Sequence, residues 1–263
     1  MNRKIAIIGG GNLGTAIAEG LLKSKFSSAE QITITKRNTG TLESLRSRGV
    51  VVTDDNASAV RNSNVVILAV KPFQVSEVLG GIKNELKDQL FISVVTGVTI
   101  QEMKEIIDKP LVIFRAMPNT AIAIQESMTC LCSSNAATDD KEYVHELFSK
   151  LGKVVGIDEK LMEAATILGA CGTAYAMRYI RANIQGGIEI GFDALTASLI
   201  AAQTVKGAAE LLLQKGSHPE QEIDKVTTPK GCTIAGLNEM EHRGFSSSLI
   251  RGVVASYRKI ARD

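Results

Sequence analysis

The stretch Lys4-Ile-Ala-Ile-Ile-Gly-Gly-Gly-Asn-Leu-Gly14 decides the fold of this chain. Its apolar run, residues 5–8, predicts a short strand that is buried on both faces. The glycines Gly9, Gly11 and Gly14 have G-x-G-x-x-G spacing, and a helical pattern begins directly after them. Between a strand and a helix, such glycines allow a tight turn, a close approach of a pyrophosphate and tight packing of the helix. The stretch therefore predicts a dinucleotide-binding site; the alternative is a glycine-rich turn without a ligand.

The end of the second predicted strand, residues 31–35, indicates which dinucleotide binds. An acidic residue at this point would bind the ribose 2′-hydroxyl of NAD. The chain instead continues as Thr35-Lys36-Arg37-Asn38, with no acid. Two cations suit the 2′-phosphate of NADP, because charge-assisted hydrogen bonds to phosphate are strong. We therefore expect NADPH as the cofactor, with NADH possible but weaker; the alternative is an ordinary basic surface turn.

Strands and helices alternate over residues 1–158, and long helical stretches follow over residues 159–263. Alternation of this kind favours a sheet whose strands are mostly parallel. The predicted fold class is α/β: a doubly wound, mostly parallel, Rossmann-type sheet followed by an all-α dimerisation domain. Later strands are predicted at 50–52, 64–70, 90–95, 111–114, 128–132 and 153–157, and the helices of the second domain at 159–169, 173–190, 194–214 and 247–261.

The predicted helix at residues 194–214 is apolar on almost every face, which is typical of a fully buried helix. A helical domain of about a hundred residues buries such a helix with difficulty, because its surface is large for its volume. We therefore expect a second subunit to cover this helix, since homo-oligomers are common. The alternative is burial within one subunit.

A polar loop from Val226 to Gly231 leads into a predicted helix that ends near Glu241. Successive backbone N–H groups at a helix start form an anion site for a carboxylate or a phosphate. Thr233 lies at this helix start, where its hydroxyl could donate a hydrogen bond to a substrate nitrogen. The alternative is that Thr233 caps the helix without contacting substrate, because Thr is a favoured N-cap residue.

The composition excludes several classes of protein. The formal net charge is +2, with acidic and basic residues interspersed, and tryptophan is absent, which argues against a nucleic-acid partner. No apolar run approaches the length of a membrane span, and the first strand begins at once, so we expect neither membrane insertion nor a signal peptide. The four cysteines form no C-x-x-C pair. We therefore expect no metal site and a reducing, cytoplasmic location.

Several motifs occur from end to end of the chain: the glycine fingerprint, Ala69-Val70-Lys71-Pro72, Arg115-Ala116-Met117-Pro118-Asn119-Thr120, Gly172 to Tyr175, Ala202-Gln203-Thr204, and Thr227 to Leu237. Together they resemble the motifs of the pyrroline-5-carboxylate reductase family. The fingerprint alone is generic, whereas Met-Pro-Asn-Thr together with Thr-Pro-x-Gly-x-Thr is specific. The resemblance implies reduction of 1-pyrroline-5-carboxylate to L-proline, the last step of proline synthesis, with NADPH. It also implies a homodimer through the helical domain, often assembled into a decamer, and a substrate carboxylate held by the backbone of residues 229–233.

These patterns together assign the site residues. The predicted cofactor-binding residues are Gly9, Gly11, Asn12, Leu13, Gly14, Lys36, Arg37, Asn56, Ala69, Val70, Lys71, Thr96, Gly97, Met117, Pro118 and Asn119. The predicted substrate-binding residues are Thr228, Lys230, Gly231, Cys232 and Thr233, of which Thr233 is also the predicted catalytic residue.

The chain departs from the family pattern at three places that shape the substrate pocket. The family's Ser-Gly-Ser-Gly-Pro-Ala-Tyr appears as Gly169-Ala-Cys-Gly-Thr-Ala-Tyr175, a usual Pro is Ala121, and a usual loop Gly is Lys230. Lys230 either strengthens carboxylate binding or is simply solvated, and we favour solvation.

Two other functions stay open at this point. Imine reduction needs a hydride donor, a hydrogen bond to the imine nitrogen and a grip on the carboxylate, so it needs no well-placed histidine. A β-hydroxyacid dehydrogenase of similar architecture would need a lysine as acid and base, for which Lys206 is the candidate. A non-catalytic paralogue would bind NADP and serve as a sensor or an assembly partner.

Overall fold

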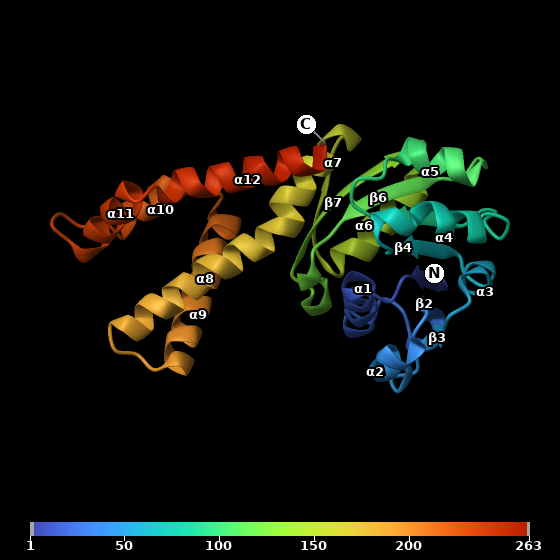
Figure 1. Cartoon of the computed structure of the whole chain (residues 1–263), viewed down its shortest axis with the longest axis horizontal. Helices are drawn as coiled ribbons and strands as arrows, with labels where there is room; N and C mark the ends of the chain where they lie inside the picture. The colour runs from blue at the N-terminus through green and yellow to red at the C-terminus, as the bar shows by residue number, and fades with distance from the viewer. Residues whose placement is uncertain (1–2, 262–263) are drawn as a thin grey trace. The chain divides into compact units, whose positions relative to one another are not determined.

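The computed structural model describes residues 3–261, which form two compact units (Figure 1). The first unit runs to Cys171 and includes the end of the last helix from Ile260. The second unit runs from Gly172 to Lys259. Among the described residues, none of the helices is both long and apolar enough to cross a membrane.

The first unit contains a sheet of eight strands in the order β3-β2-β1-β4-β5-β6-β7-β8. All neighbouring strands are parallel except β6 and β7, which are antiparallel. The prediction of a mostly parallel sheet is confirmed. The strands are β1 (Ile5–Ile8), β2 (Ile32–Thr35), β3 (Val51–Thr53), β4 (Val65–Leu68), β5 (Leu90–Ser93), β6 (Ile113–Met117), β7 (Ser127–Ser134) and β8 (Gly152–Gly156).

Both faces of this sheet are covered by helices, as a doubly wound fold requires. Alternation along β1 places Ile5 and Ile7 in one apolar cluster and Ala6 and Ile8 in the other, and all four are fully buried. The first cluster also holds side chains of α1, α2 and α6, and the second holds those of α3, α4, α5 and α7 (Figure 1). These helices are α1 (Asn12–Lys23), α2 (Glu43–Arg46), α3 (Asn56–Arg61), α4 (Val75–Ile82), α5 (Ile100–Ile107), α6 (Thr138–Ser149) and α7 (Met162–Ala165).

Strand β6 differs from its prediction, because it starts at Ile113 and continues to Met117 instead of ending at residue 114. Its antiparallel neighbour β7 extends the ladder, so that Met117 pairs with Cys130. All five residues of β6 are buried. The first part of the Arg-Ala-Met-Pro-Asn-Thr motif therefore lies inside the sheet rather than in a loop.

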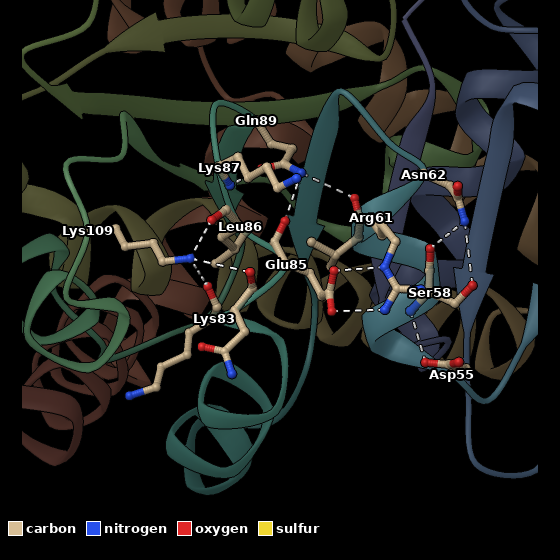
Figure 2. A network of polar contacts seen from close by, with 12 residues as sticks. Asp55, Ser58, Arg61, Asn62, Lys83, Glu85, Leu86, Lys87, Gln89 and Lys109 are labelled. Atoms are coloured by element: carbon tan, nitrogen blue, oxygen red, sulfur yellow. Dashed lines mark hydrogen bonds and ion pairs between the residues drawn. The ribbon is translucent and has the colours of Figure 1, made fainter.

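The amino ends of β4 and β5 are held by long cationic side chains (Figure 2). The Lys109 ammonium donates to the carbonyl oxygens of Lys83 and Leu86 at 2.6 and 2.7 Å, beyond the last turn of α4. The Arg61 guanidinium donates through two nitrogens to the Glu85 carboxylate, at 2.8 and 2.9 Å. Carbonyls past a helix end need such donors, because they have no partner within the helix. At this edge of the sheet, polar groups satisfy one another.

The second unit is entirely helical. Its helices α8 and α9 form a hairpin whose turn includes Gly191, at φ +113°, and Asp193. The Asp193 carboxylate accepts hydrogen bonds from the backbone N–H groups of residues 195 and 196, both at 3.0 Å, so Asp193 is the N-cap of α9. Gly187 lets the two helices approach, since a Cβ there would lie 3.2 Å from the Ala197 Cβ. The helices are α8 (Gly172–Glu189), α9 (Ala194–Lys215), α10 (Pro219–Lys225), α11 (Cys232–His242) and α12 (Phe245–Ala261).

The break predicted between helices 159–169 and 173–190 is wrong. A short 3₁₀ turn at Glu159–Leu161 precedes α7, and a π-helical segment, Thr166–Cys171, continues directly into α8. The Thr166 hydroxyl donates to the Met162 carbonyl at 2.8 Å, which satisfies a backbone acceptor at the start of the π segment. Helix α10 was not predicted; Pro219 occupies its first position, where the missing N–H costs nothing.

Burial of α9 within one subunit, the alternative for this apolar helix, is also wrong. In the single chain Leu195 is 84% exposed, Leu199 is 71% exposed and Leu213 is 70% exposed. Burying a side chain of this size stabilises a protein by about 1.5–3 kcal/mol relative to leaving it in water. The exposed leucines therefore favour a further chain that covers α9.

Candidate active site

The turn between β1 and α1 forms the floor of a pocket. Gly9 adopts φ +113°, which suits glycine, and a Cβ there would lie 2.6 Å from the Ala69 carbonyl oxygen. A Cβ on Gly14 would lie 2.0 Å from the Gly9 carbonyl oxygen, so this glycine lets the helix pack against the turn. A Cβ on Gly11 would meet no atom within 4 Å. The open space above Gly11 is where a ligand can approach the backbone.

The start of α1 offers hydrogen-bond donors to this pocket. Its N-cap is Gly11, no side chain caps it, and its first turn contains no acidic residue. The unpaired N–H groups and the positive end of the helix dipole therefore favour a bound anion. The turn itself is braced from β2, because Thr35 accepts hydrogen bonds from Gly9 N–H at its hydroxyl (3.2 Å) and from Gly10 N–H at its carbonyl (2.6 Å).

The pocket has a volume of about 820 Å³ and lies at the carboxyl ends of the central strands, where open α/β sheets bind ligands. It brings together most of the predicted cofactor residues. Those that line it are Gly9, Gly11, Asn12, Leu13, Lys36, Arg37, Asn56, Ala69, Val70, Lys71 and Thr96.

Five predicted cofactor residues do not line this pocket. Gly14 lies beneath it, where α1 packs on the turn, and Gly97 directly follows the lining residue Thr96. Met117 is only 3% exposed because it ends β6 inside the apolar core, and Pro118 is buried beside it. Asn119 accepts a hydrogen bond from Ala121 N–H (3.0 Å) and donates to the Gly169 carbonyl (3.1 Å).

The pocket also contains residues that were not predicted. The rule that ligands lie beyond strand ends could have found Thr35, Val94 and Val95, which end or follow β2 and β5. Thr120 follows the Met-Pro-Asn motif directly, so the motif itself could have signalled it. Val78 has no sequence signal, because it reaches the pocket from within α4. The other additions are Gly10, Asn38, Asp54, Pro72 and Gln74.

Arg115 forms a buried ion-pair network behind the motif. Its guanidinium, 1% exposed, donates to Glu159 and Glu163, both at 3.1 Å. Glu159 also accepts the Ile100 N–H at 2.7 Å. The two carboxylates are partly exposed, and together they compensate the charge of the buried guanidinium, which would be costly to leave unpaired. The network therefore fixes β6 against the segment that leads into α7.

The predicted substrate loop lies in the second unit and ends in an uncapped helix. Helix α11 starts at Cys232, its N-cap is Gly231, no side chain caps it, and its first turn has no acid. Thr233 is thus the second residue of the helix, so the alternative that it is the N-cap is wrong. A Cβ on Gly231 would lie 2.5 Å from the Thr228 hydroxyl, so the tight turn needs this glycine. Lys230 occupies the left-handed region at φ +61°.

Two cysteines of the first unit, Cys130 and Cys132, lie on β7 and have thiols of low reactivity. All four cysteines are free of disulfides. Burial raises the pKa of the Cys132 thiol to about 11 and also raises that of Cys130. Both thiols therefore stay protonated at neutral pH and are poor nucleophiles and metal ligands. Among the described residues, no group of three His, Cys, Asp or Glu side chains is placed to hold a metal ion.

A doubly wound sheet with this glycine turn and this pocket defines a dinucleotide-binding protein. Known families agree with that class over the first strands: the model "NADP oxidoreductase coenzyme F420-dependent" matches residues 4–97. The model "Pyrroline-5-carboxylate reductase dimerisation" matches residues 159–262.

Individual relatives extend over almost the whole chain. "Pyrroline-5-carboxylate reductase 1" of Dictyostelium discoideum is 48% identical over 98% of this chain, although the chain spans only 49% of that protein. "Pyrroline-5-carboxylate reductase 2" of the same organism is 42% identical over the entire chain and 93% of its own length. The crystal structure of Plasmodium falciparum pyrroline carboxylate reductase with NADP bound has a TM-score of 0.89 and 28% identity, covering 98% of this chain and 97% of that one. The chain belongs to the pyrroline-5-carboxylate reductase family.

Proposed function

We propose that this protein reduces 1-pyrroline-5-carboxylate to L-proline with NADPH, the last step of proline biosynthesis. One observation carries the proposal: relatives named for this activity align with both units of the chain, at 42% identity over its full length. The pocket of the first unit supports the same conclusion, because its residues fit the phosphates of a dinucleotide. The protein is thus an oxidoreductase acting on a carbon–nitrogen bond.

The first unit holds and orients the cofactor. The N–H groups at the start of α1 bind the pyrophosphate, which the open space above Gly11 admits. Lys36 and Arg37 bind the 2′-phosphate at the end of β2. Gly14 contributes by letting α1 approach the turn. Met117, Pro118 and Asn119 act from behind, because Asn119 caps the turn that starts at Thr120, a residue of the pocket. Once bound, NADPH supplies the hydride that the imine carbon accepts.

The loop before α11 holds the substrate. The N–H groups of Gly231, Cys232 and Thr233 bind the carboxylate, as the uncapped and acid-free helix start favours an anion. Thr228 shapes the loop through its contact with Gly231, and Lys230 stands beside the anion site as a solvated cation. The Thr233 hydroxyl donates a hydrogen bond to the ring nitrogen, which gains a proton as the carbon gains a hydride. Such a donor stabilises the charge that develops during reduction.

Assembly and location follow from the same reasoning. The exposed leucines of α9 and the dimerisation model over residues 159–262 support a homodimer through the helical unit, and we extend this to a decamer of five dimers. Four cysteines without disulfides support a reducing, cytoplasmic location. A net charge of +2 and few aromatic side chains support an absence of nucleic-acid partners.

A single assay tests the function. The purified protein is mixed with pyrroline-5-carboxylate and NADPH, and the loss of NADPH absorbance is followed together with the formation of proline. We expect turnover with this imine and no oxidation of β-hydroxy acids by NADP. Oxidation of a β-hydroxy acid would instead identify a dehydrogenase. NADPH binding without turnover would identify a non-catalytic paralogue.

A further inference from the structure

Asp54 lies in the pocket near the end of β2, where dinucleotide-binding folds place the adenosine ribose. Strands β2 and β3 are parallel neighbours, with Thr35 beside Thr53, and the pairing continues as Lys36 N–H donates to the Thr53 carbonyl at 3.0 Å. The residues that follow the two strands, Lys36 and Arg37 on one side and Asp54 on the other, therefore lie close together. All three line the pocket. Among the described lining residues Asp54 is the only acid.

The fold itself makes no use of the Asp54 carboxylate. Its neighbour Asp55 is the N-cap of α3, and its carboxylate accepts the Ser58 N–H at 2.9 Å. By contrast, the side chain of Asp54 is exposed and makes no hydrogen bond or ion pair among the described residues. Because this carboxylate lines the pocket and has no partner among the described residues, it is available to attract or repel a bound ligand.

The position of Asp54 sets its effect on the cofactor. In dinucleotide-binding folds an acid at the end of the second strand binds the ribose 2′-hydroxyl and selects NAD. This chain has two cations there, and it places an acid one strand over, at the end of β3. A carboxylate repels the doubly charged 2′-phosphate of NADPH but accepts a hydrogen bond from the 2′-hydroxyl of NADH.

We propose that Asp54 is a specificity-determining residue that lowers the preference of this protein for NADPH over NADH. Lys36 and Arg37 attract the 2′-phosphate, and Asp54 offsets part of that attraction. The inference rests on the proposed function, because it takes the cofactor to be NADPH. It adds that the chain retains use of NADH through its own acidic residue.

The test is the substitution Asp54→Asn, measured by calorimetric titration of the whole chain with NADPH and with NADH. Removing one negative charge near the phosphate should tighten NADPH binding about three- to tenfold and leave NADH binding unchanged or weaker. The gain should shrink in about 0.5 M salt, where exposed charges are screened over about 4 Å. Asp55→Asn is the matched control: it removes the same charge one residue away, outside the pocket, and should change the NADPH/NADH ratio by less than about twofold.

The outcomes separate this inference from the proposed function. If the wild type binds NADPH and reduces the imine, but Asp54→Asn leaves the ratio of the two dissociation constants unchanged, the role of Asp54 is overturned alone. Equal tightening of both nucleotides also overturns it, because the carboxylate would then act on the shared pyrophosphate. A wild type that binds neither nucleotide overturns both proposals.

Discussion

Replacing Lys230 with glycine tests the left-handed backbone of the loop before α11. Lys230 has φ +61°, a region that costs a residue with a Cβ about 1–2 kcal/mol. Glycine removes this cost but loses about 0.5–1 kcal/mol on folding, because it is freer in the unfolded chain. We therefore expect Lys230→Gly to raise the free energy of unfolding by about 0.5–1 kcal/mol. For a chain of this size the unfolding midpoint should rise by roughly 1–4 °C.

Lys230→Ala is the matched control, since it removes the charge but keeps the Cβ. Thermal unfolding is measured by circular dichroism at one fixed protein concentration, because assembly shifts the midpoint. The KM for pyrroline-5-carboxylate is measured in parallel. If the ammonium is solvated, KM is unchanged in both variants; if it binds the carboxylate, KM rises in both. A glycine variant no more stable than the alanine variant would show that residue 230 does not hold this conformation in solution.

The remaining predictions concern the glycine turn after β1, the cation Arg37 after β2, the apolar helix α9 and the hydroxyl of Thr233. Gly14→Ala should lower the free energy of unfolding by about 1–3 kcal/mol, because its Cβ would lie 2.0 Å from the Gly9 carbonyl oxygen; Gly11→Ala, with open space around it, should melt normally but bind NADPH weakly. Arg37→Ala should raise the KM for NADPH at least about tenfold more than that for NADH, and equal effects would rule out a 2′-phosphate contact. Leu199→Asp should abolish the dimer in size-exclusion chromatography, since a buried unpaired charge is costly; an active wild-type monomer would contradict the interface. Thr233→Ala should lower kcat by roughly tenfold or more with an unchanged melting temperature, and Thr233→Ser should retain most of the activity; near-normal kcat in the alanine variant would leave the proton to water.

Residues with a strong local pattern could be predicted from sequence. The apolar runs of β1, β4 and β5 were placed to within a few residues, because a strand buried on both faces needs continuous apolar side chains. Helix α5, Ile100–Ile107, also begins at a local signal, because Thr99 and Glu102 form a capping box. The pocket residues Lys36 and Arg37 could be predicted in the same way, because they directly follow β2.

Features that depend on distant partners could not be predicted. The last residues of β6 joined the sheet only because β7 runs antiparallel beside them, and nothing local to Met117 signals that pairing. The π-helical segment, Thr166–Cys171, spans the end of the helix predicted at 159–169 and carries the chain without a break into α8. The charge of Asp54 was visible in the sequence, but its surroundings were not, because only the register of β2 and β3 brings Asp54 and Lys36 to the same pocket.

The two edges of the sheet should respond differently when every position is substituted in turn. At the amino edge, the Lys109 ammonium donates to part-buried backbone carbonyls, so its loss leaves these carbonyls without a donor, and Arg61 forms an exposed ion pair with Glu85. Substitutions there will reduce the amount of folded protein in a cell while leaving the kinetics of surviving molecules normal. At the carboxyl edge, Asp54 lines the pocket and the first N–H groups of α1 have no side-chain cap, so these groups are available to a ligand. Substitutions there will leave the amount of folded protein unchanged and alter catalysis. Measuring protein abundance, together with the growth of cells that depend on this enzyme for proline, should therefore distinguish residues of the two edges.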